Sequence, residues 1–486
     1  MTASEQLAQF AAGSKALPKL CREYKKERAT VHLKELVGGA LSFYAAAAVA
    51  KTGGVHIFVA DDRDAAAYLL NDFYNLLDEK QVYFFPSSYK RSVAYGAEDA
   101  QGVVQRTAAM SAVKGFTKGY LIVCTYPEAL VERVADAETL RRDTIAVKVG
   151  DSISIAVLED ALVDANFTRV DFVYEPGQYS VRGGIVDVFS FSESKPYRID
   201  FFGDEVKTIR TFDVETQLSK EKLDSIYIVP EMSKNAKDST SLLGSLPRNT
   251  FIAARDLAWC KERIGSVWND DPVVADEESF ADIDQMRKKL VRGEDFLREV
   301  LDFRRIHFGA RPMGTADATI HFSTQTQPIY HKNFDRVSES FHKYLDEGYT
   351  LYILSDQEKQ ANRIRMIFED RGDNIPFTAV NRTIHEGFAD DTLRICFFTD
   401  HQLFDRFHKF NLKSDKARSG KITLSLKELN QFSQGDYIVH IDHGVGQFGG
   451  LVRTEVNGKM QEAIKLIYQN NDIIFVSIHS LHKIGR

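Results

Sequence analysis

A glycine-containing turn near the N-terminus has the setting of a phosphate-binding loop. It reads Leu36-Val-Gly-Gly-Ala-Leu-Ser-Phe-Tyr44 and runs into an alanine-rich helix. In a working G-x-x-x-x-G-K-[ST] loop, glycine N–H groups surround the phosphates, the lysine meets the terminal phosphates and the hydroxyl holds magnesium. Gly38, Gly39 and Ser42 remain, but the lysine is missing and two aromatic side chains would obstruct the loop. We therefore expect a degenerate, inactive phosphate loop and no cofactor in this chain.

Histidine pairs near the C-terminus raise the question of a metal site. His440/His443 and His479/His482 have H-x-x-H spacing, with no cysteine nearby. Because positions i and i+3 of a strand point to opposite faces, such a pair is poorly placed to share a zinc ion. The pattern favours turn and surface histidines, and no metal. No Ser-His-Asp arrangement, C-x-x-C, H-E-x-x-H or G-x-S-x-G motif is recognisable, so we expect no catalysis.

Partner recognition is indicated by Tyr197-Arg-Ile-Asp-Phe-Phe202. Alternate side chains of a strand face opposite ways, so Arg198 and Phe202 should share the outer face. Arg182, in Ser180-Val-Arg-Gly-Gly-Ile185, could reach this face from the adjacent strand. Arginine beside an exposed aromatic ring is the composition of interface hot spots. An isolated exposed phenylalanine is an equally good interpretation.

Strands and helices alternate through the first part of the chain, which predicts a parallel sheet covered by helices. We expect a degenerate RecA/P-loop-like α/β domain at 1–145, interrupted by an α+β insertion at 146–218 and resumed at 219–319. A small α/β domain at 320–410, a basic linker at 411–428 and a C-terminal domain at 429–486 follow. The short strands of the C-terminal domain should curl into a small barrel.

The hydrophobic periodicity places the elements of these domains. In the first domain we expect strands 55–60, 82–85 and 120–125 and helices 61–78 and 102–113. In the insertion we expect helix 157–165 and strands 179–189, 197–202 and 206–212, and in the resumed domain strands 225–229 and 250–256. The small domain should have strands 350–354 and 393–398 and helix 358–370, and the barrel strands 437–441, 448–456, 462–468 and 473–476.

The composition fits a multidomain globular protein. The chain has 486 residues, 44% of them hydrophobic and 27% charged, and its 62 basic and 69 acidic side chains give a net charge of −7. This charge gives no whole-molecule attraction to nucleic acid. The basic stretches at 287–305 and 413–421 could bind DNA, but acidic residues interleave with the first, which favours a solvated helix face. With no leader-like or membrane-spanning apolar run, we expect a cytoplasmic protein.

Two segments resemble known families. Residues 177–189, 196–206 and 211–217 are similar to the N-terminal part of bacterial transcription-repair coupling factors and to the UvrA-binding domain of UvrB. Val439-His-Ile-Asp-His-Gly-Val-Gly-Gln-Phe448, with Ser480-Leu-His-Lys-Ile484, resembles the RNA-polymerase-interacting domain that these factors share with CarD-type regulators. The resemblance covers nearly the whole chain. It implies an SH3/Tudor-like barrel at the C-terminus and a UvrB-like module before it.

The resemblance implies a DNA-repair adaptor. The UvrA contacts of the family fall on Arg182, Arg198 and Phe202, and contacts with the polymerase β subunit on Leu451, Val452, Arg453 and Thr454. The connection Phe85–Gly96 is shorter than the hairpin with which UvrB clamps damaged DNA.

Family members continue into an ATP- and magnesium-dependent DNA translocase, followed by a domain that masks the UvrA face. We expect this chain to be the front part of such a protein, contacting DNA only as part of the full-length protein. The alternatives are a cryptic ATPase at the degenerate loop and a DNA-binding module.

Overall fold

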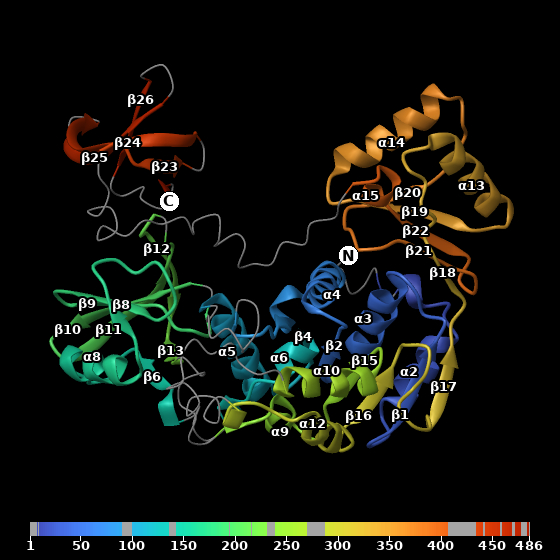
Figure 1. Cartoon of the computed structure of the whole chain (residues 1–486), viewed down its shortest axis with the longest axis horizontal. Coiled ribbons are helices and arrows are strands. Elements are labelled where there is room, and N and C mark those ends of the chain that lie inside the picture. Colours follow the sequence, from blue (N-terminus) through green and yellow to red (C-terminus); the bar gives the residue numbers. More distant parts are fainter. Residues whose placement is uncertain are drawn as a thin grey trace. The chain divides into compact units, whose positions relative to one another are not determined.

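The computed structural model describes residues 7, 9–89, 100–135, 142–193, 195–214, 216–230, 239–269, 287–406, 434–440, 443–456, 459–468, 472–477 and 484–485. The chain forms two compact units, residues 1–408 and 409–486. Mixed α/β structure with several sheets, as expected, makes up the fold (Figure 1). No helix in the described ranges is long and apolar enough to cross a membrane.

A seven-stranded sheet organises the first domain, in the order β17-β1-β16-β15-β2-β4-β3. All its neighbours pair in parallel, and helices lie on both faces, α3 and α4 on one and α10 and α12 on the other (Figure 1). The strands are β1 (Thr30–Lys34), β2 (Gly54–Val59), β3 (Val82–Phe84), β4 (Tyr120–Thr125), β15 (Phe251–Ala254), β16 (Arg304–His307) and β17 (Ala318–His321). The helices are α2 (Ala16–Glu23), α3 (Ala40–Thr52), α4 (Arg63–Leu76), α5 (Ala100–Gly115), α6 (Pro127–Leu130), α9 (Leu242–Ser245), α10 (Leu257–Asn269) and α12 (Gly293–Val300).

The local sequence explains these elements. Val55 to Val59 in β2 are all buried, as both faces of a covered parallel sheet require. Asp62 caps α4 by accepting a hydrogen bond from the Ala65 N–H. The strands and helices that we expected in this part of the chain are confirmed to within a few residues.

The inserted domain contains a six-stranded sheet in the order β12-β11-β10-β9-β8-β7, with α8 (Ile155–Asp164) beside it (Figure 1). Leu158 and Leu162 of α8 pack with Tyr197 and Ile199 in the core beneath this sheet. The strands are β7 (Thr168–Arg169), β8 (Gln178–Arg182), β9 (Ile185–Val188), β10 (Tyr197–Phe202), β11 (Glu205–Phe212) and β12 (Ser219–Leu223).

Two expectations for this domain were wrong. The stretch 179–189 is two strands, β8 and β9, because the chain reverses at Gly183, whose φ of +60° suits glycine. The strand that we placed in the resumed domain, β13 (Ser225–Ile228), instead pairs with β6 (Ile145–Lys148) and buries Ile226 and Ile228 in the core of the insertion. The two ends of the insertion are therefore joined by their own β-ribbon.

The small α/β domain has a five-stranded sheet, β18-β21-β22-β19-β20, with α13 and α14 packed on it (Figure 1). Its expected strands and helix are confirmed. The boundary expected at 319/320 falls inside β17, which still pairs with β1 of the first sheet. The elements are β18 (Thr324–Thr326), α13 (Phe334–Asp346), β19 (Thr350–Leu354), α14 (Glu358–Asp370), β20 (Thr378–Val380), β21 (Phe388–Asp390), β22 (Ile395–Thr399) and α15 (Asp400–Leu403).

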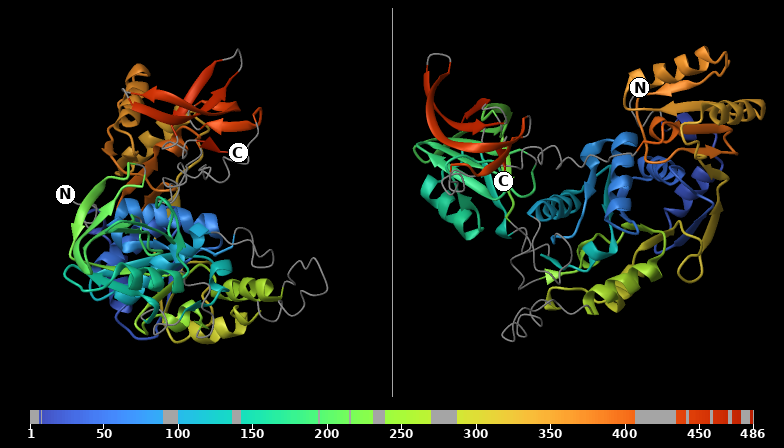
Figure 2. Two further views of the ribbon diagram at one scale, coloured as in Figure 1. Left: turned by 90° about the vertical axis from the view of Figure 1, so that its left-hand side faces the viewer. Right: turned by 45° about the horizontal axis from the view of Figure 1, so that its top comes forward.

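The C-terminal unit, drawn in red in Figure 2, contains one sheet. Its strands pair antiparallel in the order β26-β25-β24-β23-β27. Alternate side chains form its small core, which contains Ile438, Phe448, Ile464, Leu466 and Val476. The strands are β23 (Tyr437–His440), β24 (Gly444–Val456), β25 (Lys459–Ile467), β26 (Ile473–Ser477) and β27 (Ile484–Gly485), so the four strands expected here are confirmed.

Candidate partner-binding site

A buried carboxylate joins two arginines on the outer face of the inserted sheet. Asp187 of β9 has only 1% of its side chain exposed. Arg198 of β10 donates from Nε to Asp187 Oδ1 at 2.7 Å and from Nη2 to Oδ2 at 2.8 Å. Arg182 of β8 donates from Nη2 to the same Oδ2 at 2.5 Å. The two arginines that we singled out thus lie together, held by a residue that we had not considered.

Further contacts fix each guanidinium group. Arg198 Nη1 donates to the Gln217 carbonyl at 3.0 Å, and its Cζ lies 4.5 Å from the centroid of the Phe212 ring. Arg182 lies over the ring of Phe172 at 4.8 Å. The hydrogen bonds with Asp187 raise the pKa of Arg198 further above its usual range, so it is always charged.

Phe202 is the exposed aromatic of this face. It lies at the end of β10 with 77% of its surface exposed, whereas Phe201 packs partly against the core. The register between β10 and β11 shifts between Asp200 and Phe201, because Lys207 is an extra residue on β11. The burial pattern of β10 nevertheless keeps Arg198, Asp200 and Phe202 on the outer side.

The structure corrects two details of the sequence analysis. Arg182 does not come from the strand next to Arg198: β9 lies between β8 and β10. Arg198 is also not freely available, because its side chain is 14% exposed, against 37% for Arg182. The sequence analysis missed Asp187 and Phe172. The alternation of Ile185-Val-Asp-Val188 could have placed Asp187 on the face of Arg198. No local sequence pattern indicates the position of Phe172.

The degenerate phosphate loop lies against the small α/β domain. Gly39 caps the N-terminus of α3, and a Cβ atom there would lie 2.1 Å from the carbonyl oxygen of Glu386. Gly38 likewise faces the backbone of Gly387. The backbone of the small α/β domain therefore packs closely against the two glycines at this helix end.

The remaining loop residues stabilise the same contact. Ser42 is 2% exposed and donates to Asp72 Oδ2 at 2.6 Å, while Asp72 Oδ1 accepts from the His385 N–H at 2.6 Å. Tyr44 donates its hydroxyl to Asp390 at 2.5 Å, and Phe43 packs on Phe388. Burial raises the pKa of Asp72 to about 7. Ser42, which would hold magnesium in a working loop, is instead part of an interdomain network.

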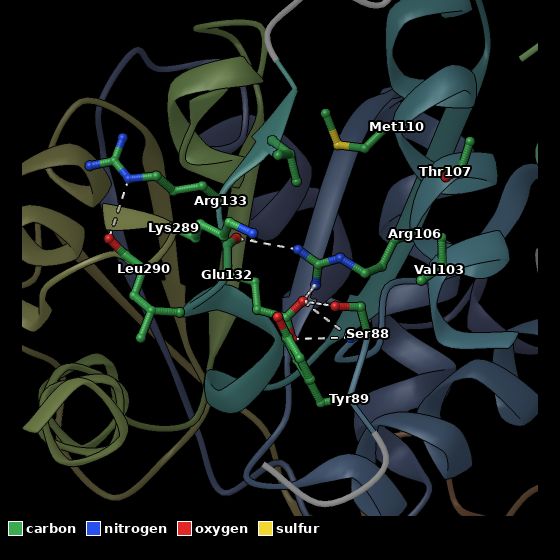
Figure 3. Close-up of a pocket in the computed structure, with 11 residues that line it drawn as sticks. Ser88, Tyr89, Val103, Arg106, Thr107, Met110, Glu132, Arg133, Lys289 and Leu290 are labelled. Atoms are coloured by element: carbon green, nitrogen blue, oxygen red, sulfur yellow. Dashed lines mark hydrogen bonds and ion pairs between the residues drawn. The ribbon is translucent and has the colours of Figure 1, made fainter. Parts of the chain in front are cut away.

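A small cavity of about 50 Å³ is lined by both polar and apolar side chains, among them Ser88, Arg106 and Glu132 (Figure 3). Glu132 accepts hydrogen bonds from the N–H of Ser88, and also from its hydroxyl. Arg106 lies 3.6 Å from the Glu132 carboxylate and donates to the carbonyls of Pro86 and Ala129. These contacts anchor the start of the connection Phe85–Gly96, of which residues 90–96 lie outside the described residues.

The histidine pair does not behave as strand alternation predicted. The rings of His440 and His443 lie 4.7 Å apart, because β23 ends at His440 and β24 begins just after His443. No group of three or more potential metal ligands occurs among the described residues. His479 and His482 lie outside those residues.

The first basic stretch is partly exposed and partly packed. Lys288, Lys289, Arg292 and Arg298 are exposed, and Arg298 pairs with Asp295. Arg292 stacks on Trp268 at 4.9 Å, and Arg304 lies over Phe251 and donates to backbone carbonyls. Arg305 donates to Thr30 Oγ1 at 2.7 Å. Arg304 and Arg305 therefore support the packing of the first domain, whereas the exposed basic residues fit the solvated face that we favoured. The stretch 413–421 lies outside the described residues.

The candidate polymerase-contacting residues lie on the long strand β24. Leu451 is 44% exposed and Val452 is half-buried. Arg453 and Thr454 belong to the same strand and pair with Glu462 and Gln461 of β25, but their side chains are outside the described set.

Comparisons with known proteins support both resemblances. The UvrB interaction domain family matches residues 145–233, and the CarD-like/TRCF RID domain family matches residues 432–486. The chain thus combines, in one polypeptide, a domain of the UvrB interaction type with a CarD-like domain.

Transcription-repair-coupling factors of two bacteria are similar to most of this chain. The chain is 23% identical to the transcription-repair-coupling factor of Staphylococcus aureus (strain bovine RF122 / ET3-1), over 88% of this chain and 43% of the relative. It is 22% identical to that of Bacillus subtilis (strain 168), over 93% of this chain and 45% of the relative. The chain spans less than half the length of these relatives. Most of this chain is thus similar to part of the transcription-repair-coupling factors, which confirms the resemblance.

Proposed function

We propose that this chain is the adaptor portion of a transcription-repair coupling factor, which binds the RNA polymerase β subunit and recruits UvrA in nucleotide-excision repair. The observation that carries this proposal is the outer face of the inserted sheet, where two arginines held by Asp187 lie on the same side as the exposed ring of Phe202. Fixed guanidinium groups suit carboxylates on a partner, and an exposed aromatic ring suits an apolar pocket.

The C-terminal sheet supplies the second half of the adaptor. We assign to it an SH3/Tudor-like barrel and contact with the polymerase through Leu451, Val452, Arg453 and Thr454 of β24. The exposed Leu451 side chain supports this assignment. The first domain is, in this proposal, a RecA-like fold without nucleotide chemistry. The absent lysine and the Glu386 carbonyl in front of Gly39 both argue against ATP binding there.

A bridging experiment tests the adaptor function. The polymerase β subunit is immobilised, the chain is added, and UvrA is then applied. We expect UvrA to be retained only in the presence of the chain. Arg198→Ala combined with Phe202→Ala should release UvrA while the chain stays on the β subunit, because truncating a hot spot costs roughly 2 kcal/mol or more.

The second arm of this experiment uses Leu451→Arg. This variant should bind UvrA in solution but should fail to remain on the β subunit, because a charge would replace an exposed apolar contact. Undiminished retention of UvrA by the Arg198/Phe202 double variant would refute the proposed UvrA site.

A further inference from the structure

The middle strand of the site carries the group that connects its two arginines. In β9, Asp187 lies directly opposite Arg198 of β10 on one side and Ser180 of β8 on the other. Its carboxylate can therefore accept hydrogen bonds from both neighbouring strands, and it does so with both oxygen atoms. Since it is almost completely buried, Asp187 cannot itself form an extensive contact with a partner protein.

The contacts of Asp187 fix the arginines in a defined direction. Arg198 uses Nε, Nη2 and Nη1 in hydrogen bonds within the domain, and Phe212 covers one face of its guanidinium group. Arg182 donates to Asp187 from Nη2 and to the Asp171 carbonyl from Nη1, and Phe172 covers one face of its guanidinium group. A guanidinium group has more N–H groups than these contacts use, so N–H groups on both arginines remain for an acceptor outside the domain.

We propose that Asp187 is a positioning residue of the UvrA-binding site, which holds Arg182 and Arg198 in the geometry that a carboxylate of the partner requires. This inference rests on the proposed function. Two guanidinium groups share one carboxylate, so the cluster keeps a net positive charge and fits an acidic segment of the partner. Preorganisation also lowers the entropic cost of ordering two long side chains on binding.

The test uses the full chain and purified UvrA, with affinity measured by titration calorimetry. Asp187→Asn keeps the size of the side chain but removes its charge and one acceptor. We expect it to weaken UvrA binding by about tenfold or more, as losses of supporting residues around a site do. Glu159→Gln is the matched control. Glu159 also pairs with an arginine, Arg169, and accepts a hydrogen bond from Tyr179, but it lies on helix α8 and does not contact Arg182 or Arg198 in these pairs. It should bind UvrA like the wild type.

A second variant and a second readout separate positioning from a general loss of folding. Asp187→Glu keeps the charge and shifts the carboxylate by one methylene group. It should melt close to the wild type but still bind UvrA more weakly. In the free chain, the Arg198 Nε–H resonance should exchange slowly with water in the wild type and rapidly in Asp187→Asn. Rapid exchange in the wild type would contradict the fixed geometry.

The outcomes distinguish this inference from the proposed function. If the wild type binds UvrA, Phe202→Ala weakens binding and Asp187→Asn does not, the positioning role is wrong while the site stands. If Asp187→Asn weakens binding by the same factor when Arg182 and Arg198 are both alanine, Asp187 does not act through them and the inference is overturned. If the wild type itself does not bind UvrA, both proposals fail.

Discussion

Asp72 places an ionisable group inside the contact between the first domain and the small α/β domain. Burial raises its pKa to about 7, so the folded protein keeps a proton on this carboxyl that the unfolded chain loses near pH 4. The folded state therefore binds more protons between about pH 4 and 7, and stability falls as the pH rises through that window. We expect Asp72→Asn to abolish this loss, which amounts to roughly 2–4 kcal/mol. Calorimetric melting of both proteins across this pH range checks the prediction. Melting temperatures that change in parallel with pH in the wild type and in Asp72→Asn would contradict it.

The N-terminus of helix α3 contacts the segment around Glu386. This contact requires glycine, which has no side chain, at position 39. Gly39→Ala would drive a methyl group into a backbone carbonyl, which cannot move without shifting the segment. We expect a loss of about 1–3 kcal/mol, as for other overpacked sites. The control is Gly265→Ala in α10, where nothing lies within 4 Å of the new Cβ. It should be neutral or stabilising by up to about 1 kcal/mol. Equal melting temperatures of the two variants would argue against this close contact.

For the whole molecule, the charge distinguishes two interpretations of its function, an adaptor and a DNA-binding module. The net charge is −7, and the described arginines of the first basic stretch pack on aromatic rings or pair within their own domain. Acidic residues also interleave with the exposed basic ones, which weakens the attraction of this stretch for DNA phosphates. We expect no saturable binding to a duplex at about 150 mM salt. Fluorescence anisotropy over a salt series measures this, and tight binding that falls steeply with salt would favour the DNA-binding alternative.

The sequence was sufficient for most of the elements. The mostly apolar run of β2 indicates a strand covered on both faces, and the alternation in β10 places Arg198 and Phe202 on one side. The missing lysine of the phosphate loop is likewise visible without coordinates. These features depend on local periodicity or on residue identity, which a single sequence contains in full.

Only the tertiary structure decided which distant segments meet. The pairing of β13 with β6, the position of β9 between β8 and β10, and the Glu386 carbonyl in front of Gly39 all join segments remote in the chain. Local patterns do not encode such pairings, because a strand or a helix end can satisfy its hydrogen bonds with many partners. For the same reason the sequence by itself identified the two arginines, whereas the fold alone showed that a buried carboxylate holds them together.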